Sequence, residues 1–483
     1  MSVLAGLEPV RVWERFEELT RIARPPKQEA EAREHVLAWA TAHAFETEAD
    51  EEGNVVVHVP ASAGREDAPR VVLQSHLDMV CERDPDSPYD PRAGRIHVVL
   101  DGDWVVAEGT TLGADNGIGV AAALAIAEDP DVAHGPLELL FTVSEEQGLD
   151  GAKNLDPALV FGRLLLNLDG TSDKAITIGC AGSWHTFTRL ALGLELVPER
   201  LETREVVVSG ARGGHSGGDI ARGRVNAIKA LGRVLSRGYE AVPFRLAHLE
   251  GGVSRNALPR EGRATIALPP GAEQAFREAA ERELGSISEQ HAGAEDALAL
   301  SIDTAHASVA ADEARTSRAL DLLATIPSGV VAMNPDLPGT VETSTSLNVA
   351  ETADGALTLA SMTRSANTPG LETVVAGIEA AARLAGAEVE VLRSYPPWRP
   401  DLDSKLLGVA RATYERLYGV PPGLEVVHGG LECAVIGDRL PGVEMISLGP
   451  EIVGPHAPGE RLSIPATQRF YYLLGALLDD LSR

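Results

Sequence analysis

Cysteines are few in this sequence, and long apolar runs are absent. Cys81, Cys180 and Cys433 are the only three among 483 residues and lie far apart, which excludes a disulfide framework and favours a reducing compartment, the cytoplasm. No apolar run reaches about 18 residues, so a membrane span is not expected. The N-terminal stretch lacks the basic start and continuous apolar core of a signal peptide and reads as an amphipathic surface helix.

Positive charge is also scarce. Lys and Arg total 42 against 71 Asp and Glu, which gives a formal net charge of −29. The resulting field repels phosphate backbones and anionic lipid surfaces, so neither nucleic acid nor membrane is an expected partner. A chain of this length is long enough for two or three packed domains. The composition therefore favours a globular protein that acts on small molecules.

The first third of the chain alternates short β-rich runs with helical patterns. Helices are predicted over 8–23, 28–44 and 117–129, and strands over 54–59, 70–75, 137–143 and 163–168. Continuous apolar strands that alternate with helices are typical of a sheet buried on both faces. The pattern predicts an α/β domain with a central, mostly parallel sheet flanked by helices.

The pattern changes from about residue 183. Residues 205–235 read as a strand, a glycine-rich turn and a helix, and residues 357–395 read as a strand, a helix and a strand. A Pro-rich run at 396–401 then resembles a linker, and α/β texture returns after it. We expect a discontinuous core domain, 1–182 plus 398–483, with an inserted α+β (ferredoxin-like) domain over 183–397.

Three of the predicted strands are followed at once by possible metal ligands. His76 and Asp78 follow the second strand, Glu145 and Glu146 follow the third, and Asp169 follows the fourth. Open parallel sheets bind their ligands outside the carboxyl ends of the strands, so these side chains can converge although they are far apart in sequence. The presence of possible metal ligands directly after three separate strands is the strongest indication of a metal site in the sequence.

Two further candidates lie on loops, and each candidate taken singly has a structural explanation. Asp115, in TTLGADNGIG, could be a helix N-cap, and His456, in PHAPGE, could be an ordinary histidine. The adjacent Glu145 and Glu146 could begin a solvated helix. Taken together, imidazole and carboxylates without a thiolate cluster favour zinc, manganese or cobalt over a structural zinc site.

The adjacent glutamates fit the needs of a two-metal hydrolase. Two divalent metals about 3.5 to 4 Å apart share a bridging carboxylate and activate a water, whose proton a neighbouring carboxylate can take. One glutamate of the pair can bind metal while the other stays free as the base. Asp78, two residues after His76, can accept the second imidazole N–H and fix the tautomer of His76.

These motifs resemble a known family. LQSHLDMV, TTLGADNGIG, TVSEEQGLDGA, LLNLDG and GPHAPGE are similar to the five metal-site blocks of the di-zinc metallopeptidases that include carnosinases, aminoacylases, glutamate carboxypeptidases and bacterial dipeptidases. Within that family the chain most resembles the cytosolic aminoacyl-histidine dipeptidases. The similarity continues through GARGGHSGGDI, GGVSRNALPREG, VETSTSLN and MTRSA, and so covers nearly the whole chain.

The resemblance implies a role for each metal-site residue. Asp115 is expected to bridge two divalent metals, most simply Zn²⁺, with Mn²⁺ or Co²⁺ as alternatives. One metal site is completed by His76 and Asp169, and the other by Glu146 and His456. Glu145 is then the general base, and Asp78 orients His76.

In the inserted domain the resemblance implies a lid. His215 matches a histidine that stabilises the tetrahedral oxyanion, and Asn256 and Arg364 match positions that bind the substrate's backbone and terminal carboxylate. A guanidinium pairs bidentately with a carboxylate, which suits a dipeptidase. Gly430, in VHGGLECA, is expected to line the substrate pocket. The competing interpretations are a glycine-rich turn or a phosphate cradle for His215, a turn glycine for Gly430 and a surface arginine for Arg364.

The expected function is a cytoplasmic metallo-dipeptidase that hydrolyses unblocked dipeptides, including Xaa-His, by attack of a metal-bridged hydroxide. Two alternatives remain open: an aminoacylase, which needs no free amine, and a non-catalytic metal- or peptide-binding protein on the same scaffold. The expected partner is a small dipeptide, and the chain is expected to be a monomer or a homodimer.

Overall fold

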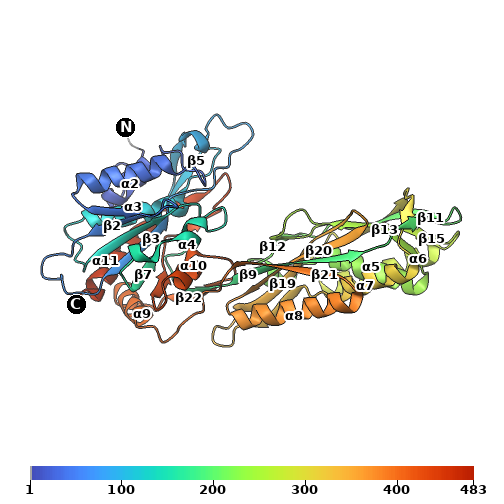
Figure 1. Cartoon of the computed structure of the whole chain (residues 1–483). Coiled ribbons are helices and arrows are strands. Elements are labelled where there is room, and N and C mark those ends of the chain that lie inside the picture. The colour runs from blue at the N-terminus through green and yellow to red at the C-terminus, as the bar shows by residue number, and fades with distance from the viewer. Residues whose placement is uncertain (1–2) are drawn as a thin grey trace. The chain divides into compact units, whose positions relative to one another are not determined.

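The computed structural model describes residues 3–483, which form two compact units (Figure 1). The first comprises the chain up to Cys180 together with Trp398–Val427 and Leu431–Arg483. The second comprises Ala181–Pro397 and the short stretch His428–Gly430. Within the described residues, no helix has the length and apolar character needed to cross a membrane.

The first unit contains a mixed eight-stranded sheet in the order β1-β2-β6-β3-β7-β23-β8-β22. Its strands are β1 (Glu46–Ala49), β2 (Val55–Val59), β3 (Val71–His76), β6 (Leu137–Thr142), β7 (Leu164–Asn167), β8 (Ala175–Cys180), β22 (Gly423–Val427) and β23 (Glu444–Ser447). The pairs β6·β3, β3·β7, β7·β23 and β8·β22 are parallel, and β1·β2, β2·β6 and β23·β8 are antiparallel.

Helices and a small second sheet complete this unit. The helices are α1 (Val10–Leu19), α2 (Ala30–Ala42), α3 (Ala114–Glu128), α4 (Asp150–Asn154), α9 (Lys405–Tyr418), α10 (Glu432–Arg439) and α11 (Ile464–Leu481), with short 3-10 turns η1 (Pro91–Ala93) and η2 (Pro157–Leu159). The small sheet joins β24 (Ile452–Val453), β25 (Arg461–Ser463), β5 (Trp104–Ala107) and β4 (Val98–Asp101).

The core explains why β3 and β6 carry so few exposed polar groups. All six residues of each strand are buried, and α3 packs against β3 and against α1. The one carboxylate inside β6, Glu138, is fully buried, pairs with Arg70 at 3.0 Å, and accepts the N–H groups of Phe161 and Gly162. A buried charge is tolerated there because its hydrogen bonds are satisfied.

The second unit is built on a nine-stranded antiparallel sheet. Along the sheet the order is β16-β11-β15-β13-β19-β20-β9-β21, and β18 pairs with β19 beside this path. Its strands are β9 (Gly182–Ala191), β11 (Glu202–Ser209), β13 (Arg245–Gly251), β15 (Gly262–Leu268), β16 (Ala299–Thr304), β18 (Gly329–Met333), β19 (Val341–Ala353), β20 (Ala356–Ser365) and β21 (Glu388–Tyr395). Two short pairs, β10 (Glu195–Leu196) with β17 (Val309–Ala310) and β12 (Gly214–His215) with β14 (Ala257–Leu258), lie outside it.

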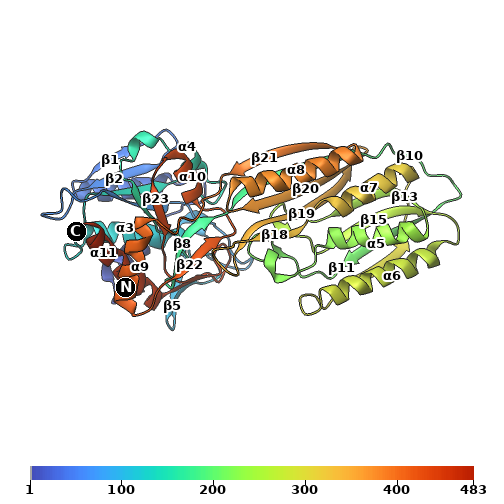
Figure 2. The same ribbon diagram turned by 90° about the horizontal axis from the view of Figure 1, so that it is seen from below.

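Helices cover one face of this antiparallel sheet, as Figure 2 shows. They are α5 (Ala227–Ala241), α6 (Glu273–Gln290), α7 (Glu313–Thr325) and α8 (Thr368–Ala385), with the turn η3 (Ile220–Arg222) before α5. Their apolar stripes and the inward side chains of the sheet form one core cluster, in which Leu231, Leu235 and Phe276 are fully buried. The unit therefore has a hydrophobic core of its own.

The predicted elements of the first third are confirmed. Helices predicted at 8–23, 28–44 and 117–129 correspond to α1, α2 and α3, and the four predicted strands correspond to β2, β3, β6 and β7. The sheet is mostly parallel, as predicted: four of the seven strand pairs named above are parallel, and the antiparallel pairs include that of β2 with β6. Alternating apolar runs reveal that strands are buried but carry little information about their direction.

Candidate metal centre

The strand-end residues meet at one edge of the eight-stranded sheet. Strands β6, β3 and β7 are neighbours and run parallel, so their carboxyl ends lie together. His76 is the last residue of β3, Glu145 follows β6 by three residues, and Asp169 follows β7 by two. The predicted convergence of these side chains is observed.

Asp115 lies at the centre of the group and uses its two oxygens differently. Its Oδ1 lies 3.1 Å from Nε2 of His76, and its Oδ2 lies 3.2 Å from Nε2 of His456. Each histidine is close to a second carboxylate, His76 to Asp169 at 3.5 Å and His456 to Glu146 at 3.1 Å. The group therefore consists of two imidazoles, those of His76 and His456, and three carboxylates, that of Asp115 itself and those of Asp169 and Glu146.

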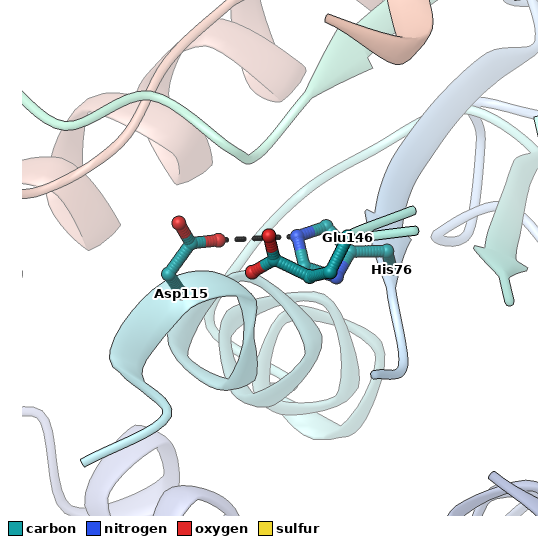
Figure 3. Close-up of side chains that lie close together, drawn as sticks. All are labelled: His76, Asp115 and Glu146. Atoms are coloured by element: carbon teal, nitrogen blue, oxygen red, sulfur yellow. Dashed lines mark hydrogen bonds and ion pairs between the residues drawn. The ribbon is translucent and has the colours of Figure 1, made fainter. Parts of the chain in front are cut away.

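Three of these residues could hold one metal ion. Ligand atoms of His76, Asp115 and Glu146 all lie within 4.8 Å of one another, and Figure 3 shows the three side chains gathered at the start of α3. Oε1 of Glu146 is buried and lies 3.1 Å from Nε2 of His456. A buried carboxylate oxygen beside an imidazole nitrogen is suited to a cation that both could bind.

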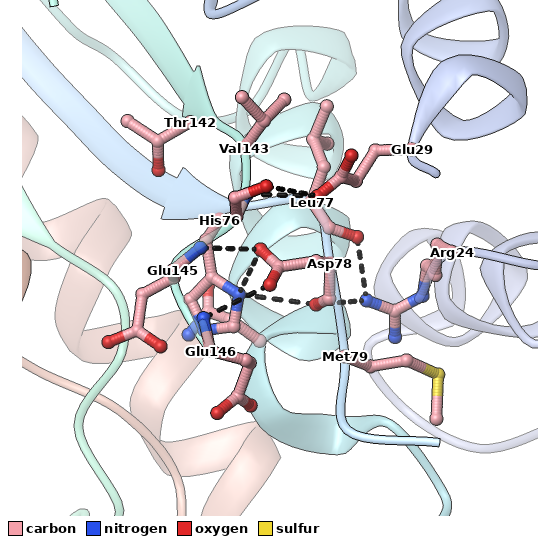
Figure 4. A network of polar contacts seen from close by, with 12 residues as sticks. Arg24, Glu29, His76, Leu77, Asp78, Met79, Thr142, Val143, Glu145 and Glu146 are labelled. Carbon is pink, nitrogen blue, oxygen red and sulfur yellow. Dashed lines mark hydrogen bonds and ion pairs between the residues drawn. The ribbon is translucent and has the colours of Figure 1, made fainter. Parts of the chain in front are cut away.

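Asp78 holds the loop that carries the two glutamates (Figure 4). Its carboxylate accepts the backbone N–H of Glu145 at 3.0 Å and that of Glu146 at 3.1 Å. Nδ1 of His76 lies 3.2 Å from the carbonyl oxygen of Asp78 and 3.4 Å from its Oδ1, so this nitrogen carries the proton. Nε2 of His76 faces Asp115 and Asp169, and once it gives up its proton it offers the lone pair that a metal requires.

The charges in this group are strongly coupled. Burial alone would lower the pKa of His76, but the carboxylates of Asp169, Asp115 and Asp78 outweigh it and raise this pKa well above its ordinary value. Hydrogen bonds to Asp115 and Glu146 raise the pKa of His456 to about 11.

Two of the carboxylic acids in the group have a pKa above that of an ordinary surface acid. Burial and the charge of Asp115 raise the pKa of Asp169 to about 7. Burial raises the pKa of Glu145 well above its usual range, and the nearby charges of Asp169 and Glu146 add to this effect. The edge of the sheet thus concentrates more negative charge than its two histidines balance, a condition that a bound divalent cation relieves.

Two residues of the site, Ser144 and the candidate ligand His456, have left-handed backbone conformations. Ser144, which precedes Glu145, has φ 53°, and His456 has φ 67°. Such φ values are uncommon for residues with a side chain and are concentrated at functional sites, where surrounding contacts hold them in place. For Ser144 these contacts are hydrogen bonds from its N–H and hydroxyl to Glu29, at 2.9 and 3.1 Å.

Sequence reasoning missed the residues that support the site from a distance. Arg24 is 1% exposed and donates to the carbonyls of Leu77 and Asp78 at 3.0 Å and to that of Gly113 at 2.6 Å. It therefore ties the loop after β3, beside which Figure 4 shows it, to the loop before α3. Nothing in the run RIARPP distinguishes this arginine from a surface residue.

Glu432 and Glu460 were also missed. Glu432, on α10, is fully buried beside β3 and β6 and accepts hydrogen bonds from Gln74 at 2.6 Å and Thr142 at 2.8 Å. Burial raises its pKa to about 7. Glu460 is 1% exposed and accepts four backbone N–H groups from the loop before α3. The only signal for Glu460 was its place in the GPHAPGE motif.

In the second unit, the predicted residues form another group. Nδ1 of His215 accepts the N–H groups of Gly217 at 3.3 Å and Gly218 at 3.0 Å, so the ring proton resides on Nε2. Burial and the charge of Arg364 lower the pKa of His215, which favours the neutral ring. His215 thus presents an N–H donor held in one tautomer.

Arg364 is buried in this unit without a counter-ion. It is 3% exposed, donates to the Tyr395 hydroxyl at 3.2 Å, and forms no ion pair with any carboxylate of residues 3–483. Its Nε and the Nδ1 of His428 are buried without partners in the same part of the chain. Burial, together with the charge of Arg364, lowers the pKa of His428 to about 4, so Arg364 is the cation of this group. An unpaired buried guanidinium is suited to an anionic ligand.

Asn256 and Gly430 lie beside this group. The carbonyl of Asn256 accepts the N–H of Ser216, and β12 pairs with β14 immediately after Asn256. A Cβ added at Gly430 would lie 2.8 Å from the ring of Tyr395, so a larger residue there would have to displace the Tyr395 side chain. Gly430 belongs to the second unit by its contacts, although it was predicted within the segment 398–483.

Comparison with known proteins finds similarity over the whole chain. A family model described as peptidase family M20/M25/M40 matches residues 72–480. The cytosol non-specific dipeptidase of Escherichia coli (strain K12) is 37% identical over 482 residues, which cover 100% of this chain and 99% of that one.

Solved structures agree. The aminoacylhistidine dipeptidase of Vibrio alginolyticus superposes with a TM-score of 0.90 at 35% identity, covering 99% of this chain and 97% of the other. The aminopeptidase PepT of Bacillus cereus superposes with a TM-score of 0.59 at 17% identity, covering 99% and 100%, which supports the fold alone.

Proposed function

Because the chain belongs to peptidase family M20/M25/M40, we propose that it is a metallo-dipeptidase that hydrolyses unblocked dipeptides, including Xaa-His, in the cytoplasm. The observation that carries this proposal is the position of Asp115, whose two oxygens face two different histidines. The full-length similarity to two dipeptidases supports the substrate class.

The donor set fits two divalent metals that share Asp115. Ligands about 2.0 to 2.2 Å from zinc at tetrahedral angles lie roughly 3.3 to 3.6 Å apart. The contacts His76–Asp115, His76–Asp169, His456–Asp115 and His456–Glu146 span 3.1 to 3.5 Å. His76 and Asp169 would hold one ion, most simply Zn²⁺ with Mn²⁺ or Co²⁺ as alternatives, and Glu146 and His456 would hold the other.

The chemistry divides between these ions and the side chain of Glu145. Bound divalent metals polarise a substrate carbonyl and lower the pKa of water toward about 7. Within residues 3–483 the carboxylate of Glu145 forms no ion pair with His76 or His456, whereas those of Asp169 and Glu146 do. The backbone N–H of Glu145 is nevertheless held by Asp78, next to that of Glu146. In our proposal its carboxylate takes the proton of the attacking water and later gives it to the leaving amine.

The second unit is proposed to act as a lid that binds the rest of the dipeptide. His215 would donate its Nε2–H to the oxyanion that develops at the attacked carbonyl. Arg364 would pair with the terminal carboxylate, Asn256 would bind the substrate's backbone, and Gly430 would leave room along the pocket wall. The tautomer of His215 and the missing counter-ion of Arg364 support these assignments.

The function is tested by histidine release from Ala-His by protein reconstituted with zinc, manganese or cobalt. Rapid release of histidine is expected, with no cleavage of N-acetyl-histidine in a parallel assay, because a dipeptidase requires the free amine. Cleavage of the acetylated compound alone would identify an aminoacylase. If neither compound is hydrolysed while metal is bound, the protein is a binding protein and the proposal is wrong.

Substitution Arg364→Ala is expected to raise the KM for Ala-His about 10- to 100-fold, because hydrogen bonds to charged groups contribute about 1.5 to 3 kcal/mol. Arg393→Ala is the matched control: Arg393 is an exposed arginine of the same unit that stacks on Trp184 with its guanidinium 4.6 Å from the ring centroid. Steady-state kinetics of both variants give the comparison. An unchanged KM for Arg364→Ala would assign the arginine to structure.

A further inference from the structure

The side chain of Glu460 binds the backbone of Asp115, the candidate bridging residue, and of the three residues before it. One of its carboxylate oxygens accepts the N–H groups of Leu112 at 2.7 Å and Gly113 at 2.9 Å, and the other accepts those of Ala114 at 2.8 Å and Asp115 at 3.2 Å. Four consecutive backbone donors, the last belonging to Asp115 itself, thus converge on one buried side chain 345 positions away along the sequence.

These donors need an external acceptor because the chain is irregular there. Gly113 has a left-handed φ of 71°, and Asp115 has φ −80° and ψ 112°, which is not helical. The first N–H groups of a helix have no partner within the helix, and buried N–H groups without acceptors are strongly destabilising. A carboxylate with about four lone-pair sites can accept all four hydrogen bonds, which an amide or a hydroxyl cannot.

Glu460 accepts the N–H groups of this segment, and the positively charged Arg24 binds one of its carbonyl groups. Arg24 donates a hydrogen bond to the carbonyl of Gly113 at 2.6 Å. The contact is close enough that a Cβ at Gly113 would lie 2.6 Å from a guanidinium nitrogen of Arg24. Arg24 also holds the carbonyls of Leu77 and Asp78. Two buried charges therefore fix the N–H and C=O groups of the segment that leads into Asp115.

Glu460 also lies on the loop that carries His456. The backbone N–H of Glu460 donates to the carbonyl of Ala457, which closes the loop as a tight turn. One short segment thus brings an imidazole to the side chain of Asp115 and a carboxylate to its backbone. The positions of Asp115 and His456 are coupled through this turn.

We propose that Glu460 is a positioning residue of the metal centre: its carboxylate fixes the backbone of residues 112–115 and so sets both Asp115 and His456 for metal binding. This inference rests on the proposed two-metal function but concerns a residue that does not itself bind metal or substrate. A Glu460→Gln substitution retains the shape of the side chain but replaces one acceptor oxygen with an NH₂ group, which faces two backbone donors that it cannot satisfy.

The test compares Glu460→Gln with Glu138→Gln. Glu138 is also a fully buried carboxylate that accepts two backbone N–H groups, but it lies near the opposite end of β6 from the metal centre. Zinc affinity is measured by competition with a chelator, amide protection of residues 112–115 by hydrogen exchange in metal-free protein, and kcat and KM with Ala-His.

For Glu460→Gln we expect a zinc affinity lower by about 10- to 100-fold, the range found for residues that orient metal ligands. We also expect loss of amide protection confined to residues 112–115 and a lower kcat with unchanged KM. Glu138→Gln should show none of these changes whatever its effect on stability. Glu460→Asp, which keeps both oxygens, should recover part of the zinc affinity.

Equal zinc affinities for Glu460→Gln and the control would overturn the inference, as would unchanged protection of residues 112–115. If Glu460→Gln does not fold, Glu460→Asp carries the same comparison. A wild-type protein that binds zinc tightly but releases no histidine would contradict the proposed function while leaving the zinc and exchange measurements decisive for Glu460.

Discussion

Replacing Glu145 with alanine is expected to lower kcat for Ala-His by about 10² to 10⁴ while metal content stays nearly unchanged. This loss corresponds to about 3 to 5.5 kcal/mol of transition-state stabilisation. The physical reason is that the two site histidines pair with the carboxylates of Asp115, Asp169 and Glu146. Within residues 3–483 neither histidine forms an ion pair with Glu145, so its removal should delete a proton acceptor but no ligand.

The matched variant is Glu146→Ala, one residue along the same loop. The buried Oε1 of Glu146 lies 3.1 Å from Nε2 of His456, and both residues are proposed ligands of one ion, so this variant should lose both metal and activity. Metal content by elemental analysis and turnover of Ala-His separate the two outcomes. Equal loss of metal in the Glu145 variant would show that Glu145 is a ligand and that the proposed roles are wrong.

Removal of the metals is the second change with a large expected effect. A chelator should abolish hydrolysis and lower the free energy of unfolding, by about 4 kcal/mol for each ion compared with protein in zinc at 1,000 times its Kd. The charge balance gives the reason: without cations, Asp115, Asp169, Glu145 and Glu146 crowd one edge of the sheet with two histidines.

Denaturant unfolding with and without chelator measures this difference, and added zinc should restore both stability and turnover. The Glu146→Ala variant serves as the control, since a protein that has lost ligands should gain less stability from zinc. Full activity in excess chelator would exclude the metal mechanism. Unchanged stability with lost activity would show that the apo fold tolerates its carboxylates unaided.

The site could be predicted from the sequence because its ligands have a local signature. His76, Glu145 and Asp169 each follow an apolar strand, and parallel neighbours in a sheet end at the same edge. The comparisons confirm the family resemblance that the motifs suggested. The individual roles of these residues remain proposals for the experiments above.

The supporting residues could not be predicted in the same way. Arg24, Glu29 and Glu460 form hydrogen bonds with backbone N–H and C=O groups. Because nearly every residue has these groups, the residue types in the sequence do not reveal the partners. The contacts described above for these three residues also join residues that are 53 to 348 positions apart. In the second unit, the pairing of β12 with β14 beside Arg364 depends on sheet topology that strand patterns alone do not specify.

The junction between the two units has a consequence for how the chain can evolve. Cys180 and Trp398, the residues on either side of the insert, form a mutual pair of backbone hydrogen bonds at 2.9 and 3.0 Å. For the first unit, residues 181–397 are therefore one loop with adjacent ends, and doubling the length of a flexible loop costs only about 0.6 kcal/mol of closure entropy. Insertions and deletions within the second unit can change its size while leaving the chain path through the first unit intact.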